Sequence, residues 1–151
     1  MWLKKRPNQL GTFLSDCELA WMKGGKGCYL FHHVWHGFDR ETERGKTVHP
    51  SQKPVALMMW CLERLRLPAG STVFDPYMGC GATGIAALEL GLHFVGCEIE
   101  PTYFEIARQR LTEGGAGAQV GIQVSSESFS PDLAGLSGLM VSLAYRSIRM
   151  S

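Results

Sequence analysis

The sequence contains no hydrophobic stretch of the kind that anchors or exports a protein. No run approaches the ~20 apolar residues that a membrane-spanning helix needs, and the N-terminus, M-W-L-K-K-R-P, has no apolar core of a signal peptide. No C-x-x-C pair occurs, and the five cysteines are scattered along the chain. Scattered cysteines, odd in number, favour reduced thiols over a disulfide framework. These absences predict a cytoplasmic protein that has no contact with membranes.

The chain also has almost no net charge. Its 15 basic and 14 acidic side chains leave a formal charge of +1 at pH 7. Any contact with nucleic acid must therefore come from a local basic patch. A hydrophobic fraction of 45% and a charged fraction of 19% are typical of a globular protein. The length suits one domain with a single core.

Residues 54–111 carry the clearest secondary-structure pattern. A proline-bracketed helix at 54–67 precedes a short buried strand at 71–75. A helix at 82–91, a strand at 93–98 and a helix at 101–111 follow, the last with Arg108 and Arg110 placed to complement the helix dipole. Strand, glycine-rich turn, helix and strand predict a right-handed βαβ unit, the start of a doubly wound parallel α/β sheet.

The regions on either side are less regular. The aromatic-rich runs at 17–22 and 28–36 are separated by K-G-G-K-G, which predicts a hairpin or a loop. Residues 37–48 are polar and charged. Residues 112–151 form a Gly/Ser-rich tail, for which a docked helix and a frayed end both remain open.

The stretch V-F-D-P-Y-M-G-C-G-A-T-G at 73–84 contains a G-x-G-x-x-G fingerprint. In such a loop the chain turns on glycines and the next helix presents unpaired N–H groups to a ligand. Glu98 follows Asp75 by 23 residues, close to the ~20 expected for an acid that binds ribose hydroxyls. These features fit NAD, FAD and S-adenosylmethionine equally well.

Three segments occur in a fixed order: V-H-P-S-Q-K-P-V-A-L at 48–57, F-D-P-Y-M-G-C-G-A-T-G at 74–84 and G-C-E-I-E-P-T-Y-F-E-I-A-R-Q-R-L at 96–111. This set resembles the amino-group DNA methyltransferases, the N6-adenine and N4-cytosine enzymes, in the permuted subclass where H-P-x-Q-K-P precedes the cofactor loop. The resemblance covers residues 1–111. It implies the cofactor-binding half of a Rossmann-like methyltransferase domain, S-adenosylmethionine as cofactor and double-stranded DNA as substrate, as in restriction–modification.

The resemblance also implies roles for individual residues. Asp75 and the backbone from Pro76 to Gly81 would line the methionine end of S-adenosylmethionine, Glu98 would hold the ribose, and Lys53 would pair with the cofactor carboxylate. The implied cofactor-binding set is His49, Ser51, Gln52, Lys53, Asp75, Pro76, Tyr77, Met78, Gly79, Gly81, Thr83 and Glu98. The family often has Phe at the position of Tyr77, and Ser and Thr at those of Cys80 and Ala82.

The family's catalytic tetrapeptide, [D/N/S]-P-P-[Y/W/F], is missing. Its side chain and a backbone carbonyl accept the amine hydrogens of the flipped base. The chain contains no Pro-Pro dipeptide; Asp75-Pro76-Tyr77 belongs to the cofactor loop, and Ser130-Pro131-Asp132 lacks both the second proline and the aromatic residue. We therefore assign no catalytic residue and expect the C-terminal part of a methyltransferase, completed by a partner chain or homo-oligomer.

Two alternatives remain beside an enzyme piece. The chain could be a non-catalytic module that holds cofactor or DNA for a partner, while an NAD-dependent oxidoreductase would leave H-P-S-Q-K-P unexplained. The choice between adenine and cytosine stays open.

Two smaller patterns each have a functional interpretation and a purely structural one. Arg40, Arg44 and Lys46 form either a DNA-phosphate contact or a solvated loop. The C-x3-H-H-x2-H pattern of residues 28–36 matches no common zinc module, so we expect no metal.

Overall fold

The computed structural model describes residues 1–11, 15–36, 39–45, 47–114 and 141–142. These residues belong to two compact units, Met1–Lys46 and Thr47–Ser142. None of the helices in the described ranges is both long enough and apolar enough to span a membrane. The expected tail from 112 onward lies outside the described residues, apart from 112–114 and 141–142.

The second unit contains a parallel sheet with helices packed against it. In chain order its elements are α1 (Val55–Leu65), β6 (Thr72–Asp75), α2 (Ala82–Glu89), β7 (His93–Gly96), α3 (Pro101–Gly114) and β8 (Val141–Ser142). Strand β6 lies between β7 and β8 and is parallel to both. The β6–α2–β7 segment is the βαβ unit that the sequence predicted, so the α/β assignment with a parallel core is confirmed.

Local sequence explains where helix α1 begins and ends. Pro54 precedes it with an extended backbone (φ −65°, ψ 140°), and the interior is free of glycine and proline. The helix ends at Arg66, which adopts a left-handed conformation (φ 50°) and donates its N–H to the carbonyl of Glu63. Leu57 and Leu62 are its buried residues, so one face of α1 is anchored in the core.

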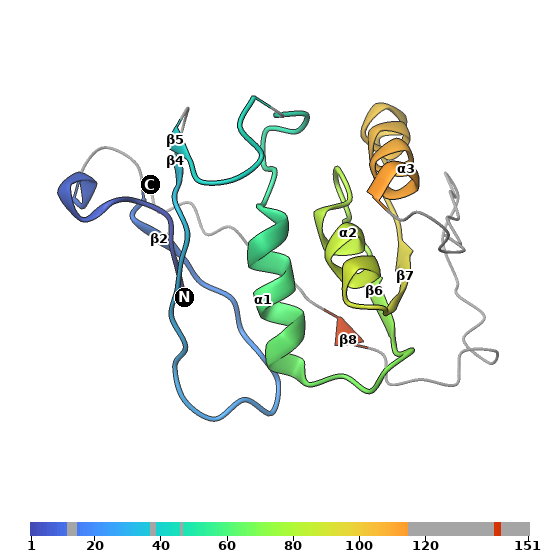
Figure 1. Ribbon diagram of the computed structural model, residues 1–151, viewed down its shortest axis with the longest axis horizontal. Helices are drawn as coiled ribbons and strands as arrows, with labels where there is room; N and C mark the ends of the chain where they lie inside the picture. Colours follow the sequence, from blue (N-terminus) through green and yellow to red (C-terminus); the bar gives the residue numbers. More distant parts are fainter. Residues whose placement is uncertain (12–14, 37–38, 46, 115–140, 143–151) are drawn as a thin grey trace. The chain divides into compact units, whose positions relative to one another are not determined.

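Helix α2 lies between α1 and α3 and packs on β6 and β7 (Figure 1). Its core side chains are small, since Ala86 and Ala87 have no exposed surface. Val73 of β6 and Phe94 of β7 fill the sheet side of this core, and Leu111 of α3 closes it. Small residues on α2 allow the helix to approach both the sheet and α3 closely.

The first unit is built from two-residue strands. Strand β1 (Trp2–Leu3) pairs antiparallel with β2 (Cys17–Glu18) and parallel with β3 (Phe31–His32). Strands β4 (Trp35–His36) and β5 (Asp39–Arg40) form a separate antiparallel pair, and Pro7–Gln9 form a short 3-10 turn. Because β1 lies between β2 and β3, the connection that contains K-G-G-K-G is a loop and not a two-stranded hairpin.

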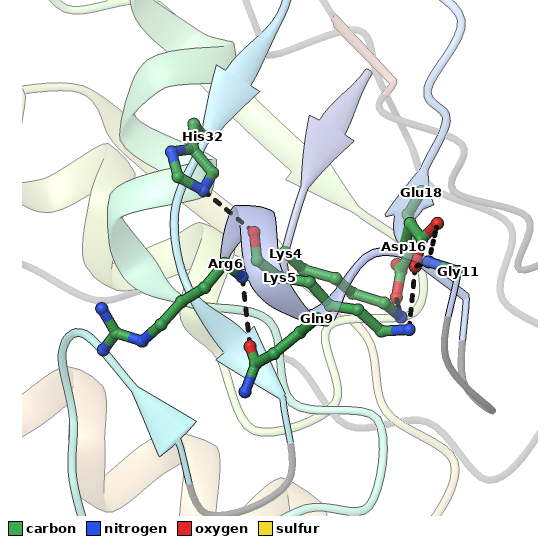
Figure 2. A network of polar contacts seen from close by, with 8 residues as sticks. All are labelled: Lys4, Lys5, Arg6, Gln9, Gly11, Asp16, Glu18 and His32. Atoms are coloured by element: carbon green, nitrogen blue, oxygen red, sulfur yellow. Dashed lines mark hydrogen bonds and ion pairs between the residues drawn. The ribbon is translucent and has the colours of Figure 1, made fainter.

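Ion pairs connect the segments of this unit (Figure 2). Lys4 Nζ lies 2.9 Å from Glu18 Oε1, and Lys5 Nζ lies 2.8 Å from Asp16 Oδ1. The Lys5 side chain is fully buried, and the Asp16 carboxylate gives its ammonium a charged partner. The hydrogen bond from Lys5 keeps the pKa of Asp16 below its usual value, and a bond from the Gly11 N–H adds to this effect.

Close packing at Gly84 generates a stability prediction. A Cβ on Gly84 would lie 2.6 Å from both Leu111 Cδ2 and Phe94 Cε1. We expect Gly84→Ala to lower the free energy of unfolding by about 1–3 kcal/mol through overpacking, measured by urea denaturation. The control is Gly114→Ala at the end of α3, where the one described residue within 4 Å of a Cβ is Ile85, at 3.8 Å. A Gly84→Ala chain as stable as the control would contradict the packing.

Candidate functional site

The candidate site lies where β6 and β7 end at the same edge of the sheet. Asp75 pairs with Gly96 in the parallel ladder. The pairing continues beyond the strands, because Cys97 N–H donates to the Asp75 carbonyl at 3.0 Å and Met78 N–H to the Cys97 carbonyl at 2.9 Å. Asp75 and Glu98, which the sequence placed 23 residues apart, therefore both lie at this edge.

The loop between β6 and α2 turns on two glycines with left-handed backbone. Gly79 has φ +53° and Gly81 has φ +79°. Gly81 is the N-cap of α2 and offers no side-chain hydrogen bond to the helix start. The first N–H groups of a helix have no intrahelical partner, so they can donate to a ligand with negative charge or acceptor atoms.

Asp75 is a half-buried carboxyl group in this loop. Its Oδ1 accepts the Tyr77 N–H at 3.0 Å, and the Thr83 side chain also bonds to it. Burial raises the pKa of Asp75 above its usual value, the two hydrogen bonds oppose this shift, and the charge of Glu98 adds to it. An acid in this setting gains from a cationic partner, because a nearby positive charge favours its ionised form.

Glu98 connects the end of β7 to the glycine turn. Its Oε2 accepts the Gly79 N–H at 2.9 Å, and its Oε1 accepts the Glu100 N–H at 2.9 Å. These bonds fix the orientation of the carboxylate. Each carboxylate oxygen has more than one lone pair, so both retain acceptor capacity for hydroxyl groups.

Residues 48–53, which precede α1, contact the glycine turn through the His49 side chain. The His49 ring is 3.7–3.9 Å from the point where a Cβ of Gly79 would stand, and its centroid is 4.1 Å from that of Tyr103. Within the segment, Gln52 is buried, accepts the Val48 N–H on Oε1 at 3.1 Å and donates its own backbone N–H to the His49 carbonyl at 3.1 Å. Ser51 is exposed and Lys53 is half-buried.

All the sequence-predicted cofactor residues belong to the second unit, but their side chains differ in accessibility. Met78 and Thr83 are only 5% and 6% exposed, so the Met78 side chain belongs to the core rather than to a ligand surface. Tyr77 is 87% exposed, as is Ile99 at 92%. The sequence motifs assign no role to Ile99, although its position directly after Glu98 indicates that it lies near the same edge of the sheet.

Helix α3 contributes two contacts that the sequence reasoning missed. Arg110 Nη1 donates to the Cys80 carbonyl at 2.6 Å, and the Tyr103 ring meets His49. The sequence placed Arg110 at the helix end as a complement to the dipole, but α3 continues to Gly114 and the guanidinium binds the glycine loop instead. Arg108 pairs with Glu105 on the surface of the same helix.

The candidate DNA-contacting residues lie in the first unit. The Arg40 guanidinium is 4.2 Å from the centre of the Trp35 ring, and Arg44 Nε donates to the Arg40 carbonyl at 2.7 Å. Lys46 lies outside the described residues. These contacts give the two arginines defined positions on β5 and the turn after it.

The histidine-rich segment has a packing role. His33 is 6% exposed and stacks on Phe31 at 5.7 Å between ring centroids, with Nε2 3.0 Å from Thr42 Oγ1. Burial lowers the pKa of His33, which favours the neutral ring. Among the described residues, no three His, Cys, Asp or Glu side chains are grouped closely enough to hold a metal ion.

Comparison with known proteins gives a family match over more than half of the chain. Residues 18–109 match the N6/N4 family model described as DNA methylase. The type II methyltransferase M2.DpnII of Streptococcus pneumoniae is 40% identical over 115 residues, covering 74% of this chain and 40% of that protein. M2.LlaDCHI of Lactococcus lactis subsp. cremoris is 36% identical over 85 residues, covering 54% and 30%. The chain thus spans less than half the length of these relatives.

Solved structures also match parts of the chain. The crystal structure of M1.HpyAVI with SAM is 30% identical, covers 73% of this chain and 59% of that chain, and has a TM-score of 0.48. A putative DNA modification methylase from Thermus thermophilus, complexed with S-adenosyl-L-methionine, is 29% identical over 52% of this chain and 31% of that chain, with a TM-score of 0.42.

The burial of Asp75 generates a pH prediction. Because the folded state raises the pKa of Asp75, the folded chain binds this proton more tightly than the unfolded chain does. The free energy of unfolding therefore falls as pH rises through the raised pKa and stays lower above it. We expect Asp75→Asn, which carries no charge, to unfold at a higher urea concentration than wild type at neutral pH, with the difference shrinking in acid.

The control for this experiment is Glu113→Gln, which removes an exposed acid from the last turn of α3. It should leave the urea midpoint close to that of wild type at every pH. Equal midpoints for Asp75→Asn and wild type at neutral pH would contradict the destabilising burial of Asp75.

Proposed function

Because its residues 18–109 match the family model, this chain belongs to the N6/N4 DNA methylase family, and we propose that it binds S-adenosylmethionine at the glycine loop of residues 75–84. One observation carries the proposal: Asp75 and Glu98 lie at the same edge of the sheet, with the glycine turn and the start of α2 between them. The family match supports the same assignment, because the glycine loop and Glu98 both lie within the matched residues.

The residues present suit the chemical groups of this cofactor. The Asp75 carboxyl group would face the positive charge of the methionine end, which would favour its ionised form. The acceptor capacity that remains on Glu98 suits the two ribose hydroxyls. The exposed side chains of Tyr77 and Ile99 offer apolar surface for the adenine ring, and Lys53 would pair with the carboxylate.

The bound cofactor would supply a methyl group activated by its sulfonium. We propose that the methyl acceptor is the exocyclic amine of adenine or cytosine in double-stranded DNA. Such an amine is a poor nucleophile, because its lone pair is delocalised into the base, and it must be positioned by hydrogen-bond acceptors. Arg40 and Arg44 are the basic side chains of the first unit that we assign to contacts with DNA phosphates.

We further propose that the acceptors for the amine come from a partner chain of different sequence, because a second copy of this chain would lack the same tetrapeptide. The support is the absence of any Pro-Pro dipeptide in the chain, together with its span of 40% of the S. pneumoniae relative. The same absence supports the second candidate function, a module that binds cofactor or DNA without catalysis. The first hypothesis predicts methyl transfer after a suitable partner is added, whereas the binding-module hypothesis predicts none.

The cofactor assignment predicts selective binding of S-adenosylmethionine by the purified chain. Isothermal titration should give binding with S-adenosylmethionine and none with NAD at the same concentrations. Asp75→Ala should weaken binding roughly ten- to a hundredfold, the range for loss of a hydrogen bond to a charged group. Glu89→Ala removes an exposed acid from the end of α2 and should bind like wild type. A folded wild-type chain that fails to bind would refute the assignment.

The missing tetrapeptide predicts that the chain alone transfers methyl groups weakly or not at all. The test is incorporation of label from methyl-labelled S-adenosylmethionine into unmethylated double-stranded DNA. The same assay is repeated with an added polypeptide that contains the [D/N/S]-P-P-[Y/W/F] segment of a relative. Robust transfer by the chain alone would contradict the proposal, and no transfer with any such partner would favour the binding module.

A further inference from the structure

We propose that Tyr103 is a positioning residue for cofactor binding, and that it acts by holding the His49 ring, and with it residues 48–52, against the glycine loop. The inference rests on the proposed function, because the ligand of the loop is the S-adenosylmethionine assigned above. Neither the sequence motifs nor the similarity to known methylases gives Tyr103 this role.

The His49 ring contacts both helix α3 and the glycine loop. Its centroid lies 4.1 Å from that of Tyr103 with the planes at 62°, an edge-to-face arrangement. Its Nε2, Cε1 and Cδ2 atoms lie 3.7–3.9 Å from the position of a Cβ on Gly79. The Tyr103 side chain therefore restricts the movement of an imidazole that also packs against the loop.

Hydrogen bonds couple the position of residues 48–52 to the position of the His49 ring. The Ser51 N–H donates to His49 Nδ1 at 3.0 Å, and the Gln52 N–H donates to the His49 carbonyl at 3.1 Å. The buried Gln52 side chain accepts the Val48 N–H and closes the turn. Because the turn is bonded to both the ring and the backbone of His49, a displaced ring would displace the turn and Lys53 directly after it.

The same bonds determine which ring atom faces the loop. Since Nδ1 accepts the Ser51 N–H, the proton of the neutral imidazole is on Nε2. Nε2 is also the closest of the His49 ring atoms to the Cβ position of Gly79, at 3.7 Å. His49 thus presents a hydrogen-bond donor toward the turn whose Gly79 N–H binds Glu98. Tyr103 keeps this donor beside the glycine turn, to which the proposed function assigns the cofactor.

The test compares Tyr103→Leu with Tyr103→Phe in the full chain, by calorimetric titration with S-adenosylmethionine. Loss of the aromatic pair should weaken binding about three- to tenfold in Tyr103→Leu, while Tyr103→Phe keeps the ring and should bind within about twofold of wild type. The matched control is Phe104→Leu, which removes a half-buried ring from the next position of α3 and should also bind within about twofold.

A second readout separates positioning from a general loss of stability. In ¹⁵N spectra of labelled histidine, wild type, Tyr103→Phe and Phe104→Leu should show the Nε2–H tautomer for His49, whereas Tyr103→Leu should show averaging between tautomers. In a double-mutant cycle, His49→Ala combined with Tyr103→Leu should bind no worse than His49→Ala alone. If Tyr103→Leu does not fold, Tyr103→Met carries the same comparisons.

The outcomes distinguish this inference from the proposed function. Wild-type binding that Tyr103→Leu leaves unchanged, or a double variant that adds both losses, overturns the role of Tyr103 and leaves the cofactor assignment intact. Absence of binding by the folded wild-type chain overturns both. Weaker binding in Tyr103→Leu, restored in Tyr103→Phe and absent from Phe104→Leu, supports the positioning role.

Discussion

The register between β6 and β7 is the constraint on which the candidate site depends. The two strands run parallel and Val73 faces Phe94 across the ladder, with both side chains buried. A slip of one residue would turn these side chains out of the core, which costs the free energy of their burial. The register that buries them also places Asp75 opposite Gly96, so that Glu98 follows two residues later at the same edge. Burial of apolar side chains thus sets the separation of two carboxylates that contribute nothing to the core.

Helix α3 then determines the shape of the glycine loop, although it follows the loop in sequence. Ala107 lies 3.2 Å from the point where a Cβ of Gly81 would stand, and Arg110 binds the Cys80 carbonyl. Leu111 fills the space that Gly84 leaves open. The absence of side chains at Gly81 and Gly84 therefore allows α3 to approach the loop closely. A change on α3 would reach the site through the contacts of this helix with the glycine loop and with His49.

Local patterns in the sequence were sufficient for the elements from α1 to α3 of the second unit, but they indicated neither strand β8 nor the contacts between elements. Pro54 directly precedes α1, and Gly91 lies in the turn between α2 and β7. Such signals for the ends of helices depend only on residues that are adjacent in sequence. The Arg110–Cys80 bond joins residues 30 positions apart, and the His49–Tyr103 pair depends on how a loop folds over a helix. Neither contact produces a periodic pattern in the sequence. The first unit was the least predictable, because two-residue strands are too short to show alternation.

Asp75 shows why a site of this kind is stabilised by its own ligand. Burial opposes the ionisation of Asp75, and the nearby Glu98 charge acts in the same direction. The free chain therefore keeps a carboxyl group in surroundings that disfavour its charged form, at the end of the strand that anchors the core. A cationic ligand would oppose that effect, because a nearby positive charge favours the ionised form of the carboxyl group. Binding and folding stability are linked in any case, since a ligand that binds only the folded chain stabilises it. Part of that stabilisation would come through Asp75, whose pKa is raised by burial.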